Sequence, residues 1–387
     1  MHEGSRTHEH NFDDSRLVVT GGGTGGHVYP ALALATEFRR RHPHAGILYV
    51  GSRRGLETRV VPRTGLEFAA LSVGGVVGKT VPVKVYGTLS TAYSVLRSLG
   101  ILRRFRPDVV LGTGGYVSVP VVMAAQLLGI PTLLQEQNVV PGMANRFLAR
   151  KANHLFLPSE DALKSLPMGV QQRAMVAGNP VRKEFSLVER DLARREYGIG
   201  DSDILLVIMS GSGGAATINN VTARWISGLK NPPSGLRVLF GTGKRYYRDV
   251  IEEIGQIPEW AAVVEYIDDA PGALAAADML LCRAGAMTLA EATVMGVPMI
   301  IVPSPNVAHE HQTANAKALE RAGAAIAVED EDFDVATLDE SIRALLADSP
   351  RLRRMAEASR EYGDPEALDR MVNTIEQIIA RTKGEPR

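Results

Sequence analysis

Apolar positions along this chain fall into short aliphatic runs that alternate with longer segments of helical spacing. Short apolar runs bounded by glycine and proline are typical of buried strands, and amphipathic segments are typical of helices that cover a sheet. The alternation predicts an α/β fold of mainly parallel sheets with right-handed crossovers. In the first half we expect strands at Leu17–Thr20, Ile47–Val50, Phe68–Val73, Val109–Leu111, Thr132–Leu134, His154–Leu157 and Met175–Ala177. In the second half we expect them at Ile204–Met209, Arg237–Phe240, Val263–Ile267, Met279–Leu281, Met299–Val302 and Ala325–Val328.

The pattern also predicts how the chain divides. At 387 residues it is long for one core, so two domains are expected. Pro180 disfavours helix at Asn179, which predicts an extended linker there. We expect a disordered leader at 1–15, an N-terminal domain at 16–178, a C-terminal domain at 179–364, and a final helix within 365–387 that packs back onto the protein. Pro30 is expected to begin the first helix of the N-terminal domain.

Composition excludes several classes of protein. Lys+Arg and Asp+Glu both number 43, which argues against a general nucleic-acid binder. Cys282 is the single cysteine, so no disulfide forms within the chain. Residues 109–135 carry no charge, but glycine and proline cut them into pieces too short to span a bilayer, so a buried strand–helix–strand unit is expected.

Two glycine-rich turns carry the candidate chemistry. Gly21–His27 follows the first strand, and Ser210–Ala215 follows the first strand of the second half. A strand that feeds a glycine turn and a helix lets main-chain N–H groups approach an anion. Two such turns suggest two doubly wound, Rossmann-like domains that face each other across a cleft and bind a phosphate-bearing substrate.

The first turn alone also fits a dinucleotide dehydrogenase. Gly21, Gly23 and Gly26 have the G-x-G-x-x-G spacing. That fingerprint needs an acidic residue after the next strand, where this chain has Arg53 and Arg54. The arginines leave an NADP-dependent oxidoreductase open, although it does not explain the second turn.

The second half supplies candidate sugar and phosphate ligands. Glu291 lies one turn into the helix after a strand, where a carboxylate suits a ribose diol. Gln312 and Asn315 share a helical face that offers amides to sugar hydroxyls. No metal site is expected, because Asp201–Asp203 precedes its strand and Glu329–Asp334 has the composition of a solvated turn. The diphosphate then relies on the helix start near Ser212 and on a cation such as Arg182.

A basic, apolar segment points to a membrane surface. Residues 73–106 contain valines, Tyr86 and Leu89 together with lysines and arginines, and no acidic residue. Apolar groups with an unopposed basic rim suit an anionic membrane. An ordinary packed helix with a solvated face is the alternative.

Several blocks in order resemble a known family. They are Gly-Gly-Thr-Gly-Gly-His (22–27), Gly-Thr-Gly-Gly-Tyr-Val-Ser (112–118), Gln-Glu-Gln-Asn (135–138), Gly-Asn-Pro-Val-Arg (178–182) and Arg-Ala-Gly-Ala-Met-Thr-Leu-Ala-Glu (283–291). With these blocks the chain resembles the MurG family, the peptidoglycan N-acetylglucosaminyltransferases of glycosyltransferase family 28, which have the GT-B fold. The resemblance runs from about Leu17 to beyond Ala325.

The resemblance implies a function. It implies a peripheral enzyme at the cytoplasmic face of the cell membrane that transfers GlcNAc from UDP-GlcNAc to the 4-hydroxyl of MurNAc in undecaprenyl-diphosphoryl-MurNAc-pentapeptide, with inversion. The C-terminal domain then holds UDP-GlcNAc and the N-terminal domain takes the lipid, with no cofactor, metal or nucleic acid. Carried over, the donor-binding residues are Thr24, Gly25, Gly26, Asn138, Arg182, Ser212, Ile267, Ala286, Met287, Thr288, Leu289, Ala290, Glu291 and Gln312.

Two positions depart from the family pattern. A longer side chain usually stands at Gly213, and histidine often stands at Gln135, which leaves His27 and Glu136 as candidate bases. His27 has the better pKa for that role near neutrality. The alternatives are a GT-B enzyme with another lipid acceptor, a UDP-sugar epimerase, and a non-catalytic nucleotide-sugar sensor.

Overall fold

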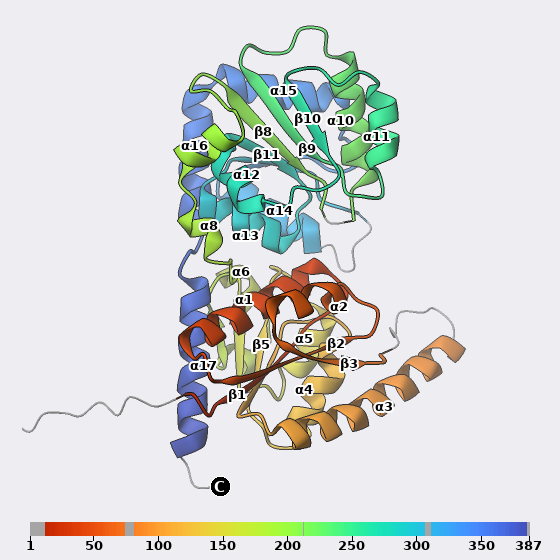
Figure 1. Ribbon diagram of the computed structural model, residues 1–387, viewed down its shortest axis with the longest axis vertical. Helices are drawn as coiled ribbons and strands as arrows, with labels where there is room; N and C mark the ends of the chain where they lie inside the picture. The colour runs from red at the N-terminus through yellow and green to blue at the C-terminus, as the bar shows by residue number, and fades with distance from the viewer. Residues whose placement is uncertain (1–11, 74–80, 212, 306–310, 385–387) are drawn as a thin grey trace, which may run out of the picture. The chain divides into compact units, whose positions relative to one another are not determined.

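The chain forms two compact units. The computed structural model describes residues 12–73, 81–211, 213–305 and 311–384, with 81–89 described by their backbone alone. Unit 1 runs to Gln137, continues over Pro141–Pro180 and ends with the residues from Glu366 on, whereas unit 2 comprises Asn138–Val140 and Val181–Pro365. Both are parallel sheets covered by helices (Figure 1).

Unit 1 contains a seven-stranded sheet in the order β3-β2-β1-β4-β5-β6-β7, and every pairing in it is parallel. Its strands are β1 (Arg16–Thr20), β2 (Gly46–Ser52), β3 (Glu67–Leu71), β4 (Val109–Gly112), β5 (Thr132–Gln135), β6 (His154–Leu157) and β7 (Ala174–Val176). Its helices are α1 (Gly25–Arg41), α2 (Glu57–Val60), the 3₁₀ turn η1 (Pro62–Thr64), α3 (Val81–Phe105), α4 (Ser118–Leu127), α5 (Met143–Leu148), α6 (Glu160–Lys164), α7 (Met168–Gln171) and α17 (Ala367–Gly384).

Unit 2 contains a six-stranded parallel sheet in the order β10-β9-β8-β11-β12-β13. Its strands are β8 (Ile204–Met209), β9 (Leu236–Gly241), β10 (Ala261–Val264), β11 (Met279–Cys282), β12 (Met299–Ile301) and β13 (Ala325–Ala327). Its helices are α8 (Glu184–Leu187), α9 (Arg190–Glu196), α10 (Ala216–Gly228), α11 (Tyr247–Ile254), α12 (Ala270–Ala276), α13 (Ala286–Met295), α14 (His311–Arg321), α15 (Val335–Ala347) and α16 (Ser349–Tyr362).

Each sheet is buried on both faces, as a doubly wound fold requires. In β1, Leu17 and Val19 pack into the core that contains α1 and α17, while Val18 packs into the core that contains α3 and α4. In β8, Leu205 and Leu206 face opposite cores in the same way. Because successive strand residues point to opposite faces, strands buried on both sides must be apolar throughout. The doubly wound α/β prediction is confirmed.

The strand predictions hold throughout the chain. Each of the thirteen expected strands is present, with ends that differ by at most a few residues. The uncharged stretch 109–135 forms β4, α4 and β5, with β4 and β5 paired in parallel, so it is a buried unit as expected. Within the part of the chain that the structure describes, no helix is long and apolar enough to cross a membrane.

The predicted start of the first helix is wrong. Helix α1 begins at Gly25, so Pro30 lies inside it. Thr24 is extended, with φ −130° and ψ 161°, and its carbonyl accepts the first helical bond, from Val28 N at 3.1 Å. The glycine turn therefore sets the helix start, and Pro30 omits one hydrogen bond in the second turn.

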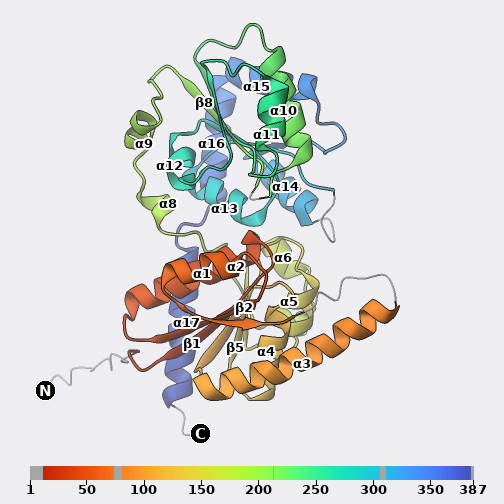
Figure 2. The same ribbon diagram turned by 45° about the vertical axis from the view of Figure 1, so that its right-hand side comes forward.

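The last helix joins unit 1. Leu368, Met371, Val372 and Ile375 of α17 are buried in the core that also contains α1. Arg41 at the end of α1 forms ion pairs with Asp369 and Glu376 of α17. Figures 1 and 2 show α17 beside α1 and β1. The sequence predicts that this helix packs back, but not which half receives it.

Candidate functional site

In each unit the strand order reverses at one point of the sheet. In unit 2 the order reverses between β8 and β11, and helices α10 and α13, which follow these strands, cover opposite faces. In unit 1 the order reverses between β1 and β4, which are followed by α1 and α4. Ligands of open α/β sheets bind at such reversals, at the carboxyl ends of the strands. Both glycine-rich turns lie at these points.

The second glycine turn is shaped by close backbone contact. Gly214 has φ +76°, and a Cβ there would lie 2.7 Å from Thr242 O. Gly243, at φ +79°, would place a Cβ 2.6 Å from Gly214 N. The loops after β8 and β9 therefore touch backbone to backbone, which larger residues would prevent. Ser212 lies outside the described residues, and a Cβ on Gly213 would meet nothing within 4 Å, so this position has room for a longer side chain.

Arg182 and Glu291 lie within electrostatic range of each other in unit 2. Burial raises the pKa of Glu291 from 4.5 to about 7, and Arg182 opposes that rise. Glu291 makes no hydrogen bond or ion pair with the residues that the structure describes. Arg182 lies 3.5 Å from Glu184 and 5.2 Å from the centre of the Phe185 ring, and its buried Nε has no hydrogen-bond partner in the described chain. Both side chains retain capacity for a polar ligand.

The other residues of unit 2 that the family resemblance assigns to donor binding differ in how far they are buried. Met287 and Leu289 are buried, so they can offer a ligand little beyond their main chain. Ala286, Thr288 and Ala290 are partly exposed in the first turns of α13. Ile267 is also buried, against Gly241.

The two candidate amides on α14, Asn315 and Gln312, have different hydrogen-bond partners. Asn315 is buried, and its Nδ2 donates to Ala284 O and to Asn138 Oδ1, each at 3.2 Å. Its Oδ1 accepts from Val139 N at 3.0 Å. The Asn315 amide therefore holds the segment 138–140, and its proposed contact with a sugar stays a prediction. Gln312 accepts from Ser304 N at 2.9 Å through Oε1, which leaves its amide NH₂ group for a ligand.

Asp330 and Asp203, from the two acidic segments weighed as metal sites, have structural roles. Asp330 pairs with Arg283 and accepts from Thr217 Oγ1 at 3.0 Å, so the acidic run is not simply a solvated turn. Asp203 accepts from Gly200 N at 2.9 Å and lies 3.4 Å from Arg237. Among the described residues no group of three or more His, Cys, Asp or Glu side chains is arranged to hold a metal ion.

The first glycine turn is fixed from several sides. Tyr49 OH donates to Gly21 O at 2.8 Å, and Thr113 Oγ1 donates to His27 O at 2.6 Å. Burial and the charge of Glu57 raise the pKa of Tyr49 well above its usual value, so its phenol stays a donor. Thr24, Gly25 and Gly26 follow at the start of α1, where main-chain N–H groups point along the helix axis.

His27 sits at the end of this turn. Its Nδ1 lies 3.2 Å from Thr24 Oγ1. Across from it, Gly114 has φ +101°, and a Cβ there would lie 2.8 Å from His27 Cδ2. The imidazole therefore needs glycine at 114. When Nδ1 carries the hydrogen and donates to Thr24, Nε2 is the nitrogen able to accept a proton.

Glu57 supports the first glycine turn, and sequence reasoning does not predict this contact. It is fully buried behind the first turn, and its carboxylate accepts from Ser52 N at 2.9 Å, Ser52 Oγ at 2.6 Å and Gly23 N at 3.4 Å. A Cβ on Gly22 or Gly55 would lie within 2.5 Å of this carboxylate. No spacing rule links residue 57 to residue 23; only the cluster of glycines hints at a close neighbour.

Glu136 and Gln135 are bound into the backbone of unit 1. Glu136, buried, accepts from Gln137 N at 3.0 Å and from Gly142 N and Asn145 Nδ2, each at 2.9 Å. Gln135, also buried, donates to the Glu136 carbonyl at 3.0 Å. These hydrogen bonds fit Glu136 as a residue that positions the loop after β5, and they leave His27 as the better candidate base.

Two Rossmann-like units in one chain, each with a glycine turn at its topological switch point, are the architecture of the GT-B fold, which one class of glycosyltransferases has. The glycosyltransferase family 28 N-terminal domain matches residues 17–157, and the family 28 C-terminal domain matches residues 205–371. The chain therefore belongs to glycosyltransferase family 28, and within it to the MurG family.

Individual relatives agree with this assignment. A Symbiobacterium thermophilum protein named UDP-N-acetylglucosamine–N-acetylmuramyl-(pentapeptide) pyrophosphoryl-undecaprenol N-acetylglucosamine transferase is 44% identical over 96% of this chain and 98% of its own. The crystal structure of Acinetobacter baumannii MurG aligns with a TM-score of 0.74 at 27% identity, covering 94% of this chain and 99% of that one. A Listeria monocytogenes structure titled as a putative UDP-N-acetylglucosamine 2-epimerase aligns with a TM-score of 0.68 at 15% identity, covering 97% and 98%, which is likeness of fold alone.

Proposed function

We propose that this protein transfers GlcNAc from UDP-GlcNAc to the 4-hydroxyl of the MurNAc of undecaprenyl-diphosphoryl-MurNAc-pentapeptide, with inversion at the anomeric carbon. The observation that carries the proposal is the 44% identity, over 96% of the chain, with a transferase named for this donor and this acceptor. An enzyme with this activity is a glycosyltransferase of peptidoglycan synthesis.

We assign the donor to the switch point of unit 2. Glu291, partly buried and without a partner among the described residues, suits the two ribose hydroxyls as a bidentate acceptor. The Arg182 side chain is 39% exposed, so the outer part of its guanidinium suits the diphosphate. Backbone N–H groups at the start of α10 add the anion site typical of helix N-termini.

We assign the acceptor chemistry to unit 1. In one in-line step, the MurNAc O4 attacks the anomeric carbon, the bond from that carbon to the phosphate oxygen breaks, and UDP leaves with the electron pair. His27 Nε2 takes the hydroxyl proton. The charge that develops on UDP is stabilised by groups fixed before the reaction, and many enzymes gain most of their rate acceleration in this way.

We also propose that unit 1 docks on an anionic membrane at the cytoplasmic face of the cell membrane, through the outer face of α3. Much of the predicted segment, including Tyr86 and Leu89, lies outside the described residues or side chains. The described part supports the proposal: Tyr93 is 56% exposed and Leu96 is 67% exposed, and the exposed Arg97 is adjacent. Figure 2 shows α3 along α4 in unit 1.

The function is tested by incubating the protein with labelled UDP-GlcNAc, with and without the lipid-linked MurNAc acceptor. We expect label in the lipid fraction only when the acceptor is present. Isomerised UDP-sugar without transfer would indicate an epimerase, and tight binding without turnover would indicate a sensor. In a parallel incubation with diacylglycerol in place of the MurNAc acceptor, label in the lipid would indicate another lipid acceptor.

A further inference from the structure

A pocket of about 540 Å³ lies in unit 2 at the edge of the sheet opposite the candidate donor site. Asp278 and Pro298, which line it, immediately precede β11 and β12, so the pocket lies at the amino ends of these strands. Glu291 and the glycine turn lie at or beyond the carboxyl ends. The volume falls in the range of small-molecule sites. Nothing in the transfer reaction uses this pocket.

The pocket has an excess of positive charge. Its guanidinium groups come from Arg190, Arg353 and Arg360, and Asp278 is the one acidic residue in its lining. Asp278 is already neutralised by Arg190 at 2.6 Å and by Arg194 at 2.9 Å. Within the described parts of the chain, neither Arg353 nor Arg360 forms a hydrogen bond or ion pair. Two cations on the same helix, α16, are therefore left for an external anion.

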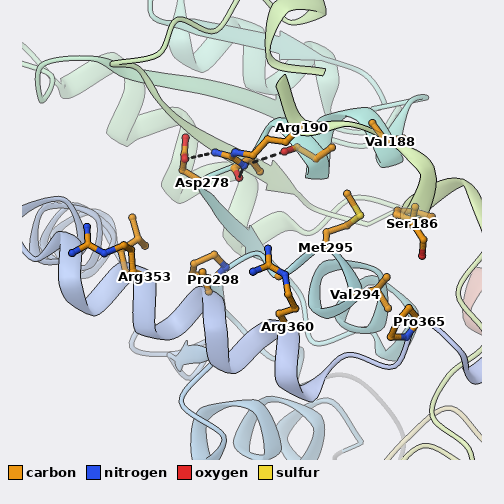
Figure 3. A pocket seen from close by; sticks show the side chains of 16 residues that line it. Ser186, Val188, Arg190, Asp278, Val294, Met295, Pro298, Arg353, Arg360 and Pro365 are labelled. Atoms are coloured by element: carbon orange, nitrogen blue, oxygen red, sulfur yellow. Dashed lines mark hydrogen bonds and ion pairs between the residues drawn. The ribbon is translucent and has the colours of Figure 1, made fainter. Parts of the chain in front are cut away.

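Arg360 packs against a glycine. Its guanidinium lies against Gly296, the residue that ends α13, where a Cβ would be 2.8 Å from Nη2 and 2.9 Å from Cζ. Figure 3 shows Arg360 rising from α16 between Met295 and Pro298, below the Arg190–Asp278 pair. Because glycine allows this close approach, the guanidinium lies against the pocket lining although the residue is exposed. The neighbouring walls are apolar, from side chains such as Val188, Met295, Leu352 and Ala356.

Both main connections between the units border this pocket. The chain enters unit 2 at Val181, and Phe185, Ser186, Val188 and Arg190 line the pocket a few residues later. It leaves unit 2 at Pro365, which also lines the pocket. A ligand there contacts the start of one connection and the end of the other.

We propose that this pocket binds a soluble phosphate monoester with a compact apolar group, and that its occupancy changes the rate of glycosyl transfer without displacing the donor. The phosphate pairs with Arg360, Arg353 two helical turns away on α16 adds positive charge at the rim, and the apolar group rests on the walls. The effect on rate follows from the contact with both connections. The claim that the pocket binds a phosphate monoester depends on the pocket alone. The claim that binding changes the rate of transfer rests on the proposed function.

Binding is tested by calorimetry of the full-length protein with phenyl phosphate, using phenol and inorganic phosphate as half-ligands. We expect phenyl phosphate to bind the UDP-saturated protein more tightly than either half-ligand. Arg353→Gln with Arg360→Gln should weaken binding about tenfold or more, the loss of charge-assisted bonds. Arg354→Gln on the same helix, outside the pocket lining, is the matched control and should bind as the wild type does.

A second variant fills the pocket and leaves its charge unchanged. Ala356→Leu fills the wall of the pocket and should abolish phenyl phosphate binding while leaving UDP affinity unchanged. Equal binding by the wild type and both variants, competition between phenyl phosphate and UDP, or equal affinity for inorganic phosphate would overturn the site.

The rate effect is tested with saturating UDP-GlcNAc. Phenyl phosphate should change turnover in the wild type by at least twofold and leave Ala356→Leu unaffected. An unchanged wild-type rate despite measured binding would overturn the regulatory half. Absence of any transfer, with or without phenyl phosphate, would refute the proposed function and not the binding site.

Discussion

Replacing Glu291 by glutamine removes a charge that the folded protein holds in a poorly hydrated place. The pKa of Glu291 rises from 4.5 to about 7 through burial. Because the folded pKa lies above the unfolded one, the native state binds more protons than the unfolded state between pH 4.5 and 7. Stability therefore falls as the pH rises through that window. Glutamine has nearly the same shape and no charge, so it removes this pH dependence.

The size of the effect follows from the shift. A rise from 4.5 to about 7 corresponds to an upper bound of about 3 kcal/mol at pH 8. Since the Glu291 residue is only partly buried, we expect about 1–3 kcal/mol, or about 2–12 °C in Tm for a unit of this size. Glu291→Gln should therefore melt higher than the wild type at pH 8 and at nearly the same temperature at pH 5. Equal differences at both pH values would refute burial as the cause.

The same variant tests the ribose contact. Donor binding needs the ionised carboxylate, so wild-type affinity for UDP should fall about tenfold between pH 8 and pH 6. Glu291→Gln should bind UDP more weakly at pH 8 and lose this pH dependence in calorimetry. A variant that binds UDP as tightly as the wild type at pH 8 would remove Glu291 from the donor site.

Four further predictions concern unit 1. His27→Ala should lower turnover by about 10²–10⁴ with little change in donor KM, and near-normal turnover would exclude His27 as the base. Gly114→Ala should lower turnover by displacing the His27 ring, and a crystal structure of the variant with the ring unmoved would contradict this. Glu57→Ala should lower the free energy of unfolding in urea by about 2–4 kcal/mol, because buried donors lose their acceptor. Unchanged stability would argue that the Glu57 carboxylate does not hold the glycine turn. Glu136→Gln should lower unfolding stability measurably, whereas a purely catalytic role would leave stability unchanged and reduce turnover alone.

The sequence predicts the fold well because the features that indicate strands and turns lie within a few consecutive residues. Thirteen strands are readable as short apolar runs, and the two glycine turns are readable as strand ends that precede helices. The reversal of strand order that turns them into crevices follows from the doubly wound pattern. Pro30 is misread because proline favours the first turn of a helix, while the extended Thr24 sets the actual start.

The supporting contacts escape prediction because they join residues that are distant in sequence. Asn315 looks like a ligand amide beside Gln312, yet it holds Asn138 and Val139. Glu136 looks like a free base, yet three donors occupy its carboxylate. Hydrogen-bond pairing of this kind depends on tertiary placement and has no periodicity in the chain.

The central claim is that unit 2 holds the donor diphosphate with main-chain amides and Arg182, and the ribose with Glu291. The most direct measurement is the electron density of UDP in crystals of the full-length protein grown with EDTA. We predict ribose hydroxyls on the Glu291 carboxylate and phosphates between Arg182 and the start of α10. Nucleotide density elsewhere, or binding that appears only when magnesium bridges the phosphates to aspartates, would contradict the claim.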